Sequence, residues 1–270
     1  MQLVAYGAQD IYLTGNPQIT FFKVVYRRHT NFSMEAIEQT FNGTVPRQTA
    51  TISRNGDLVH RMYLEIECAS KSSVEAMAQA NFGSAIIQDC EVEIGGQKID
   101  KQTGLWMETW AELTEPNPTG TTAQHVAAGA GTLFQNMSGM GGVDGNTDAY
   151  NINVPLQFWF CRNPGLALPL IALQYHEVKV NLTFGAQQKT TNGQTKQDLT
   201  LNSASLWCDY VYLDTDERRR FAQVSHEYLI EQLQFTGDES VTDTGNIRLN
   251  FNHPVKELVW VETSATFGSY

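Results

Sequence analysis

Apolar and polar residues alternate with a period of two along much of this chain, which is the pattern of half-buried β-strands. In the segment RMYLEIEC (residues 61–68), the side chains of Met62, Leu64 and Ile66 are expected to face a core, and those of Tyr63 and Glu65 to face solvent or a neighbour. Runs rich in β-branched and aromatic residues, bounded by Gly, Pro, Asn and Asp, indicate further strands. We predict strands at residues 18–27, 36–45, 57–69, 86–94, 153–161, 175–184 and 204–213.

Helical periodicity is rare by comparison. Residues 74–80 are a short candidate, and Leu105, Trp106, Trp110 and Leu113 recur at helical spacing before Pro116 ends the pattern. Strands without crossover helices between them pair antiparallel, because a parallel pair needs a long connection. The sequence therefore predicts an all-β protein built as a jelly-roll β-sandwich.

Two segments differ from this strand pattern. Residues 115–150 are rich in glycine, threonine and asparagine and have little periodicity, which predicts a long surface loop tied down only by Leu133, Phe134 and Met140. Residues 214–225 (DTDERRRFAQVS) are polar and predict a short linker helix. After this linker, strand patterns return at residues 227–235, 246–251 and 256–262.

Charge and hydropathy exclude several classes of function. Acidic residues outnumber basic ones by 29 to 18, a formal charge of −11, which repels a phosphate backbone, so direct nucleic-acid binding is not expected. The longest strongly apolar run, residues 166–173, contains a proline and is far shorter than the roughly 20 residues of a membrane span. The first residues lack the basic and apolar regions of a secretory signal, so we expect synthesis in a cytosol.

The cysteines are Cys68, Cys90, Cys161 and Cys208, and they are widely separated. None forms a CxxC pair or has a histidine at zinc-ligand spacing. Three of them lie within apolar alternation, where cysteine behaves as a small hydrophobic residue. We predict buried free thiols rather than disulfides or a metal site.

Motifs of catalysis are absent from the sequence: it has no GxSxG, HExxH, Walker lysine loop or dinucleotide-binding glycine motif. His176 and His226 each precede a glutamate, but adjacent side chains of a strand point to opposite faces and cannot share a proton or a metal. Acidic residues at 214, 216 and 217 could gather a cation, yet the arginines beside them more simply neutralise a surface helix. We therefore predict no enzyme activity, no cofactor and no metal site.

Two basic clusters and four sequons are the remaining candidate sites. A cluster of arginines is either a solvated face or a subunit interface, where arginine binds carboxylates in bidentate geometry. A sequon is a short pattern that often arises by chance, and Asn136 is expected to be the most accessible, whereas Asn181 falls inside a predicted strand. The candidate interface residues are Arg27, Arg28, Arg218, Arg219 and Arg220, and the candidate glycosylation sites are Asn31, Asn42, Asn136 and Asn181.

Six segments together closely resemble the major capsid proteins of large icosahedral double-stranded DNA viruses related to chloroviruses and iridoviruses. They are LVAYGAQDIYLTGNPQITFFKVVYRRHTNF (3–32), SRNGDL (53–58), EIGGQKIDK (93–101), NPGLALPLIALQYHEVK (163–179), DERRRFAQ (216–223) and HEYLIEQLQFTG (226–237). The resemblance implies a tandem jelly roll: a first domain at residues 1–213, a linker at 214–225 and a truncated second domain at 226–270.

The same resemblance implies a structural function. Three chains are expected to form a pseudo-hexagonal capsomer that contacts neighbouring capsomers and minor capsid proteins, in a virion assembled in the host cytoplasm. Loop 115–150 is then either a tolerated insertion or the exposed tower of the capsomer, where contact with the host surface would occur.

Two other functions remain as alternatives. A carbohydrate-binding β-sandwich could use tryptophans as sugar platforms, although Trp159 and Trp207 lie in strand patterns and are expected in the core. A jelly-roll enzyme of the cupin type needs clustered histidine and carboxylate ligands, which the scattered histidines do not supply. The other tryptophans open to the first reading are Trp106, Trp110 and Trp260.

Overall fold

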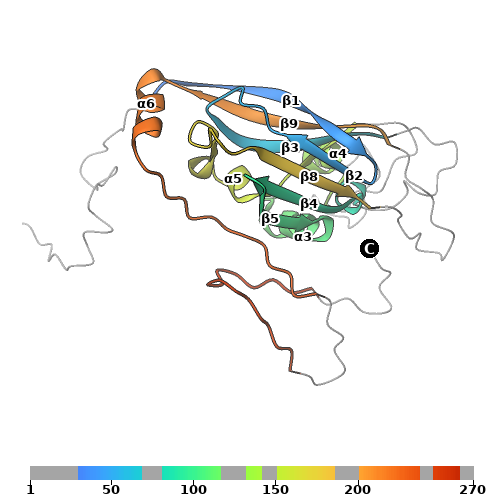
Figure 1. Ribbon diagram of the computed structural model, residues 1–270. Helices are drawn as coiled ribbons and strands as arrows, with labels where there is room; N and C mark the ends of the chain where they lie inside the picture. The colour runs from blue at the N-terminus through green and yellow to red at the C-terminus, as the bar shows by residue number, and fades with distance from the viewer. Residues whose placement is uncertain are drawn as a thin grey trace, which may run out of the picture.

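The computed structural model describes residues 30–68, 81–116, 132–141, 151–185, 201–237 and 246–261 (Figure 1). The strand predicted at residues 18–27 and the helix predicted at 74–80 lie outside these ranges. The strands are β1 (Phe32–Thr44), β2 (Arg47–Thr51), β3 (Leu58–Cys68), β4 (Ile87–Ile94), β5 (Gln97–Thr103), β6 (Asn151–Pro155), β7 (Leu168–Pro169), β8 (Val178–Phe184) and β9 (Leu201–Leu213). The helices are α2 (Phe82–Ala85), α3 (Gly104–Thr114), α4 (Leu133–Ser138), α5 (Trp159–Arg162) and α6 (Thr215–Gln223), with a 3-10 turn at Pro164–Leu166.

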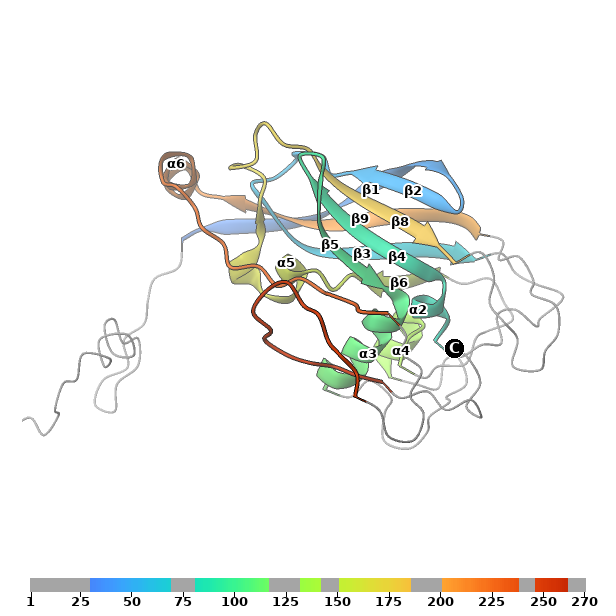
Figure 2. The same cartoon turned by 60° about the horizontal axis from the view of Figure 1, so that its bottom comes forward.

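The strands form two antiparallel layers that β1 joins (Figure 2). The hydrogen-bonded order is β5-β4-β8-β2-β1-β9-β3-β6, with the short β7 paired to β3. Most neighbours in this order are distant in sequence, which is the arrangement of two interlocked Greek keys. We call β6-β3-β9-β1 the first sheet and β2-β8-β4-β5 the second sheet. The all-β jelly-roll prediction is confirmed.

Strand β1 turns from one sheet to the other in the middle of its length. Its residues up to Thr40 pair with β9, and those from Phe41 onward pair with β2. The side chain of Gln39, just before the change of partner, is buried and accepts hydrogen bonds from the backbone N–H (2.9 Å) and the hydroxyl (2.6 Å) of Ser53. Tyr210 donates from its hydroxyl to the carbonyl of Ser53 at 2.6 Å. The corner is therefore held by hydrogen bonds within the core.

The core lies between the inner faces of the two sheets. Paired residues of adjacent strands share a face, so Leu64 and Leu206 line the first sheet, and Val92 and Val180 line the second; each is at most 1% exposed. The predicted alternation in β3 is confirmed, because Met62, Leu64 and Ile66 are all buried. Burial of such side chains contributes roughly 1.5–3 kcal/mol each relative to exposure.

Helix α3 confirms the predicted helix but buries a different side. The hydroxyl of Thr103 caps its start by accepting from the backbone N–H of Trp106 at 3.2 Å. The buried residues include Met107 and Ala111, whereas Leu105 is 49% exposed. Trp106 and Trp110, which the sequence placed on the apolar side, are only half-buried, and Leu113 is exposed.

Helical turns occur at two places where the sequence predicted something else, once a strand and once a loop. The strand predicted at residues 153–161 ends at Pro155, and α5 follows, because the helical turn places both Trp159 and Phe160 in the core, which a strand cannot do with adjacent residues. Within the loop predicted at 115–150, α4 forms on a reciprocal capping box between Thr132 and Gln135. The T-x-x-Q spacing was a readable signal for this helix.

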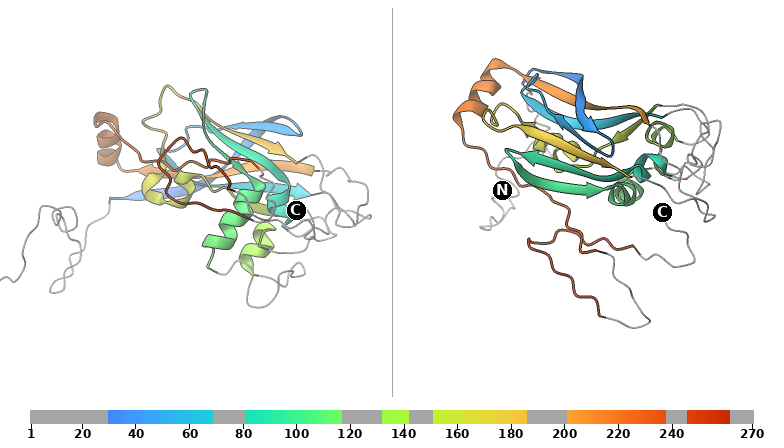
Figure 3. Two further views of the ribbon diagram at one scale, coloured as in Figure 1. Left: turned by 90° about the horizontal axis from the view of Figure 1, so that it is seen from below. Right: turned by 45° about the vertical axis from the view of Figure 1, so that its right-hand side comes forward.

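The strands predicted at 227–235, 246–251 and 256–262 are wrong for the residues that the structure describes. Residues 224–237 and 246–261 are extended but form no ladder there (Figure 1). A strand needs a partner strand for its backbone groups, and sequence alternation alone does not supply one. The helix predicted within residues 214–225 is confirmed as α6, which projects at one end of the sandwich (Figure 3). Its role as a linker between two domains stays a prediction.

Replacing Gly104 with alanine is expected to destabilise the sandwich by about 2 kcal/mol or more, because overpacking forces the backbone to shift. A Cβ at this position would lie 1.9 Å from the carbonyl oxygen of Ser84 and 2.4 Å from that of Ile87. Urea unfolding measures the loss. Gly165→Ala is the control, since its nearest contact is the side chain of Asn163 at 3.2 Å. Equal stability of the two variants would contradict this account of how α3 packs.

Candidate functional site

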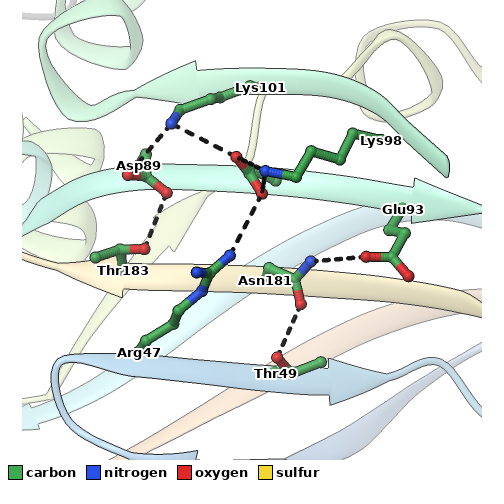
Figure 4. Close-up of polar contacts among 9 residues, drawn as sticks. Arg47, Thr49, Asp89, Glu93, Lys98, Lys101, Asn181 and Thr183 are labelled. Carbon is green, nitrogen blue, oxygen red and sulfur yellow. Dashed lines mark hydrogen bonds and ion pairs between the residues drawn. The ribbon is translucent and has the colours of Figure 1, made fainter. Parts of the chain in front are cut away.

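The outer face of the second sheet carries a network of charged and polar side chains (Figure 4). Because side chains alternate along β2, β4, β5 and β8, these residues point away from the core, toward the outer surface of the sheet. Opposite charges lie across from each other on adjacent strands, an arrangement that stabilises pairing. We call this surface the ionic face, and its residues are Arg47, Thr49, Asp89, Glu91, Glu93, Lys98, Lys101, Asn181 and Thr183.

Glu91 is the centre of the ionic face and is only 2% exposed. Its carboxylate lies 2.9 Å from Lys98 Nζ, 3.5 Å from Lys101 Nζ and 3.9 Å from Arg47 Nη2. Burial alone would raise the pKa of Glu91, but the ammonium groups of Lys98 and Lys101 hold it below its usual range. The three cations come from β2 and β5, so the contact ties the strands on either side of β4 and β8 together.

Asn181 belongs to this network rather than to a free surface. Its side-chain oxygen accepts from the Thr49 hydroxyl at 2.8 Å, and its amide nitrogen donates to Glu93 at 3.2 Å. The residue is 8% exposed and lies in β8 (Figure 4). A glycan on this nitrogen would break the contact with Glu93, so the geometry argues against the sequon at Asn181.

The other sequon asparagines lie at the surface. Asn31 precedes β1, Asn42 is on β1 near its turn, and Asn136 is on α4; all are exposed. Their exposure makes them accessible to modification, and glycosylation there stays a prediction.

The structure describes one of the two predicted arginine clusters, the one on α6. Arg218 does not point freely into solvent, because its Nε lies 3.0 Å from the buried carboxylate of Asp57. Asp57 also accepts from the backbone N–H of Leu213 at 2.8 Å, so this pair fixes the start of α6 to the sandwich. Arg219 contacts Asp216 only at 3.9 Å. Arg220 is exposed on α6, and Arg27 and Arg28 lie outside the described residues.

The outer face of the first sheet contains a tryptophan that sequence analysis placed in the core. Trp207 is only half-buried, and its indole Nε1 donates to Glu65 at 2.5 Å. Ser205 donates to the same carboxylate at 3.3 Å. Trp207 lies outward because its neighbours in sequence, Leu206 and Cys208, take the inward positions. Trp159 is buried, as predicted.

Cys90, Cys161 and Cys208 are free thiols, and burial raises the pKa of each one. The side chain of Cys68 lies outside the described part of the structure. Cys90 and Cys208 are buried in the core, and Cys161 is half-buried with its pKa raised to about 12. A thiol with such a pKa is protonated at neutral pH and is a poor nucleophile. Among the described residues no three His, Cys, Asp or Glu side chains are placed to hold a metal ion. A search of that same part of the chain finds no helix long and apolar enough to cross a membrane.

The described chain is thus a two-layer jelly roll whose outward faces carry polar networks. Comparisons with known proteins show which family it belongs to. Residues 20–214 match the family described as "Major capsid protein N-terminus", and residues 217–270 match "Large eukaryotic DNA virus major capsid protein". The chain belongs to the family of major capsid proteins of large eukaryotic DNA viruses, which is a family of structural proteins and not of enzymes.

Relatives of the chain come from several such viruses. It is 57% identical to the major capsid protein of Pyramimonas orientalis virus over 99% of this chain and 66% of the relative. It is 46% identical to that of Paramecium bursaria Chlorella virus 1 over 96% of this chain and 59% of the relative. The quasi-atomic model of the PBCV-1 virus capsid superposes with a TM-score of 0.67 at 40% identity, covering 87% of this chain and 57% of that one. The chain spans 48% to 66% of the first relatives' own length.

Glu91 is expected to stabilise the fold in a pH-dependent way. Because its pKa is lower in the folded protein than the ordinary value of 4.5, its contribution is fully present above pH 4.5 and is lost as the pH falls through the folded-state pKa. Urea unfolding of wild type and Glu91→Gln measures it: the difference in unfolding free energy should be constant at pH 6–8 and shrink below about pH 4.5. A difference that grows in acid would contradict the assignment.

Arg218→Ala is expected to cost about 1–2 kcal/mol of stability, because it leaves the buried carboxylate of Asp57 without its cation. The cost is limited by the exposure of the arginine itself, which is 59% for its side chain. Arg219→Ala is the matched control on the same helix and should change stability by less than about 0.5 kcal/mol. Thermal unfolding of both variants tests this, and equal effects would show that the Asp57 contact does not anchor α6.

Proposed function

We propose that this chain is the shell-forming part of a major capsid protein, which builds the icosahedral capsid of a large double-stranded DNA virus. The observation that carries the proposal is the 57% identity to a viral major capsid protein across 99% of the chain. The jelly roll suits the role because a closed sandwich has few free edges and presents rigid side faces to neighbours. Its site of action is the virion.

The proposed organisation is a tandem jelly roll. The first sandwich extends through residue 213, residues 214–225 connect, and residues 226–270 begin a second jelly roll. Supporting this division, β9 ends at Leu213, and α6 follows at once with its start capped by Asp214. Three chains would then place their jelly rolls side by side in a pseudo-hexagonal capsomer. Obligate interfaces of this kind bury on the order of 2,000 Å² or more.

Arginine side chains on α6 are the proposed contacts to other capsid components. Arg219 and Arg220 are exposed, and α6 projects beyond the end of the sandwich, where a neighbouring capsomer or a minor capsid protein can reach it (Figure 3). Arg218 is not among the proposed contacts, because its guanidinium is already paired with the carboxylate of Asp57. Arg27 and Arg28 remain proposed contacts on sequence grounds. Assembly in the host cytoplasm, contact of loop 115–150 with the host surface, and lack of direct genome contact complete the proposal.

A carbohydrate-binding module is less well supported. A sugar platform needs an aromatic ring exposed on a flat surface, and Trp159 is buried while Trp207 is half-buried and bonded to Glu65. Trp106 and Trp110 lie against each other with ring centroids 5.5 Å apart, and Arg162 covers the Trp110 ring at 4.8 Å. Arg162 thus blocks one face of Trp110, whereas Trp260 is 84% exposed and is the candidate ring that keeps this alternative open.

Light scattering on the full-length product of the source gene is expected to give the mass of three chains, because a pseudo-hexagonal capsomer needs six jelly rolls. The mass should stay unchanged on dilution to the nanomolar range, as for an obligate interface. A monomer at micromolar concentration would contradict the capsomer proposal.

Replacing Arg219 and Arg220 together with glutamate is expected to leave the trimer intact and to reduce assembly of trimers into larger shells. Charge reversal at an exposed contact introduces like-charge repulsion with the partner's carboxylates. Electron microscopy and sedimentation of assembled particles measure the effect. Arg248→Glu is a control that makes the same kind of charge reversal at an exposed arginine outside α6. Normal shell assembly by the arginine variant would refute the role of α6.

A further inference from the structure

The second sheet ends at β5, whose outer edge has no strand beside it among the described residues. A free edge presents unpaired backbone groups that another strand can bind, which makes it a site for association. At the other end of the strand order, β6 is short and ends at Pro155, which limits association with another strand at that edge. Strand β5 is longer and contains no proline, so its edge needs another form of cover.

Residues 226–237, which we call the arm, run past this edge after leaving α6 (Figure 2). Gln232 Nε2 donates to the backbone carbonyl of Ile99 at 2.5 Å. One residue later, the backbone N–H of Leu233 donates to Asp100 Oδ1 at 3.0 Å. The arm therefore binds β5 through side chains and not through a ladder, which is why it has no strand geometry.

A third contact fixes the arm one residue before Gln232. Glu231 lies 3.2 Å from Arg162 Nη2, and it also pairs with Lys256. Arg162 comes from α5 and stacks over the ring of Trp110 on α3, with 4.8 Å from its guanidinium carbon to the ring centroid. Cation–π stacking holds the guanidinium in one orientation and directs it to the carboxylate. The pKa of Glu231 is lowered, first by its hydrogen bond from Lys256 and then by Arg162.

The receiving groups are held in place by the sandwich itself. Asp100 is 4% exposed, and its second carboxylate oxygen accepts from Gln102 Nε2 at 3.0 Å. Gln102 in turn donates to the carbonyl of Gln157 at 2.8 Å. Burial raises the pKa of Asp100, and hydrogen bonds from the N–H of Leu233, the side chain of Gln102 and the N–H of Lys101 partly offset this. A carboxylate buried in this way is stabilised when a backbone N–H is supplied to it.

We propose that the first jelly roll carries a binding site for an extended acidic peptide, formed by Ile99, Asp100 and Arg162, and that the arm of the same chain occupies it. The site recognises a carboxylate at Arg162 and, two residues later, a backbone N–H at Asp100. Its consequence is that the β5 edge is closed to a second copy of the chain. This site does not depend on capsid assembly, because every group in it belongs to one chain.

Leu233→Pro tests the proposal because it removes the hydrogen bond that the arm's backbone donates to Asp100. Leu229→Pro is the matched control: Leu229 is 86% exposed, and its amide makes no hydrogen bond within the described residues. Hydrogen–deuterium exchange of the 270-residue chain should show at least tenfold faster exchange over residues 231–237 and faster exchange over β5 in Leu233→Pro alone. Sedimentation velocity should show concentration-dependent self-association of that variant and not of the control.

Two results would overturn the proposal. If both proline variants exchange like wild type across the arm, the arm is not bound at Asp100. If the arm is released but β5 exchange and mass do not change, the arm does not close the edge. Glu231→Gln controls for a general folding defect, because it removes the charge that pairs with Arg162 and keeps the backbone contact of Leu233. It should accelerate hydrogen exchange in the arm by a smaller factor than Leu233→Pro does. Its unfolding midpoint should equal that of wild type within error. Accelerated exchange throughout the sandwich in this variant would also overturn the proposal.

Discussion

The structure depends on one strand serving two sheets. Because β1 pairs with β9 up to Thr40 and with β2 from Phe41, the two layers are parts of one continuous strand path and cannot slide apart. The buried amide of Gln39 at this corner must be hydrogen-bonded, since an unsatisfied polar group there would cost about 1–3 kcal/mol. Ser53 supplies both donors and is itself held by Tyr210. This polar corner fixes the angle at which the apolar faces meet.

The two outward faces follow from that closed core. Each strand that sends Leu or Val inward must send its intervening residues outward, and on the second sheet these are mostly charged. Glu91 shows the effect of crowding, because the side chains of Lys98, Lys101 and Arg47 surround it although no other layer of the described residues covers the sheet there. The ionic face therefore neutralises much of its own charge through contacts within the chain.

The sequence predicted the long elements well and the short ones badly. Strong alternation identified β3, β4, β8 and β9, and the helical spacing before Pro116 identified α3. It failed for α5, because an apolar run has the same appearance in a buried strand and a buried turn. It failed again after residue 226, where alternation is present but the partner strands are not among the described residues. The sequence analysis overlooked the capping box that starts α4, because the surrounding residues are rich in glycine.

For the candidate sites, the sequence limited the inference to residue types and their order along the chain. The sequence by itself determined the jelly-roll class, the lack of catalytic motifs and the family resemblance, because these depend on residue type and order. Only the tertiary structure decided which polar residues meet. Arg218 reaches Asp57, Asn181 lies between Thr49 and Glu93, and Arg162 joins Trp110 to Glu231, each across long stretches of chain. Local sequence carries the period of a strand, but the register between strands sets these contacts, and register is fixed only when the core packs.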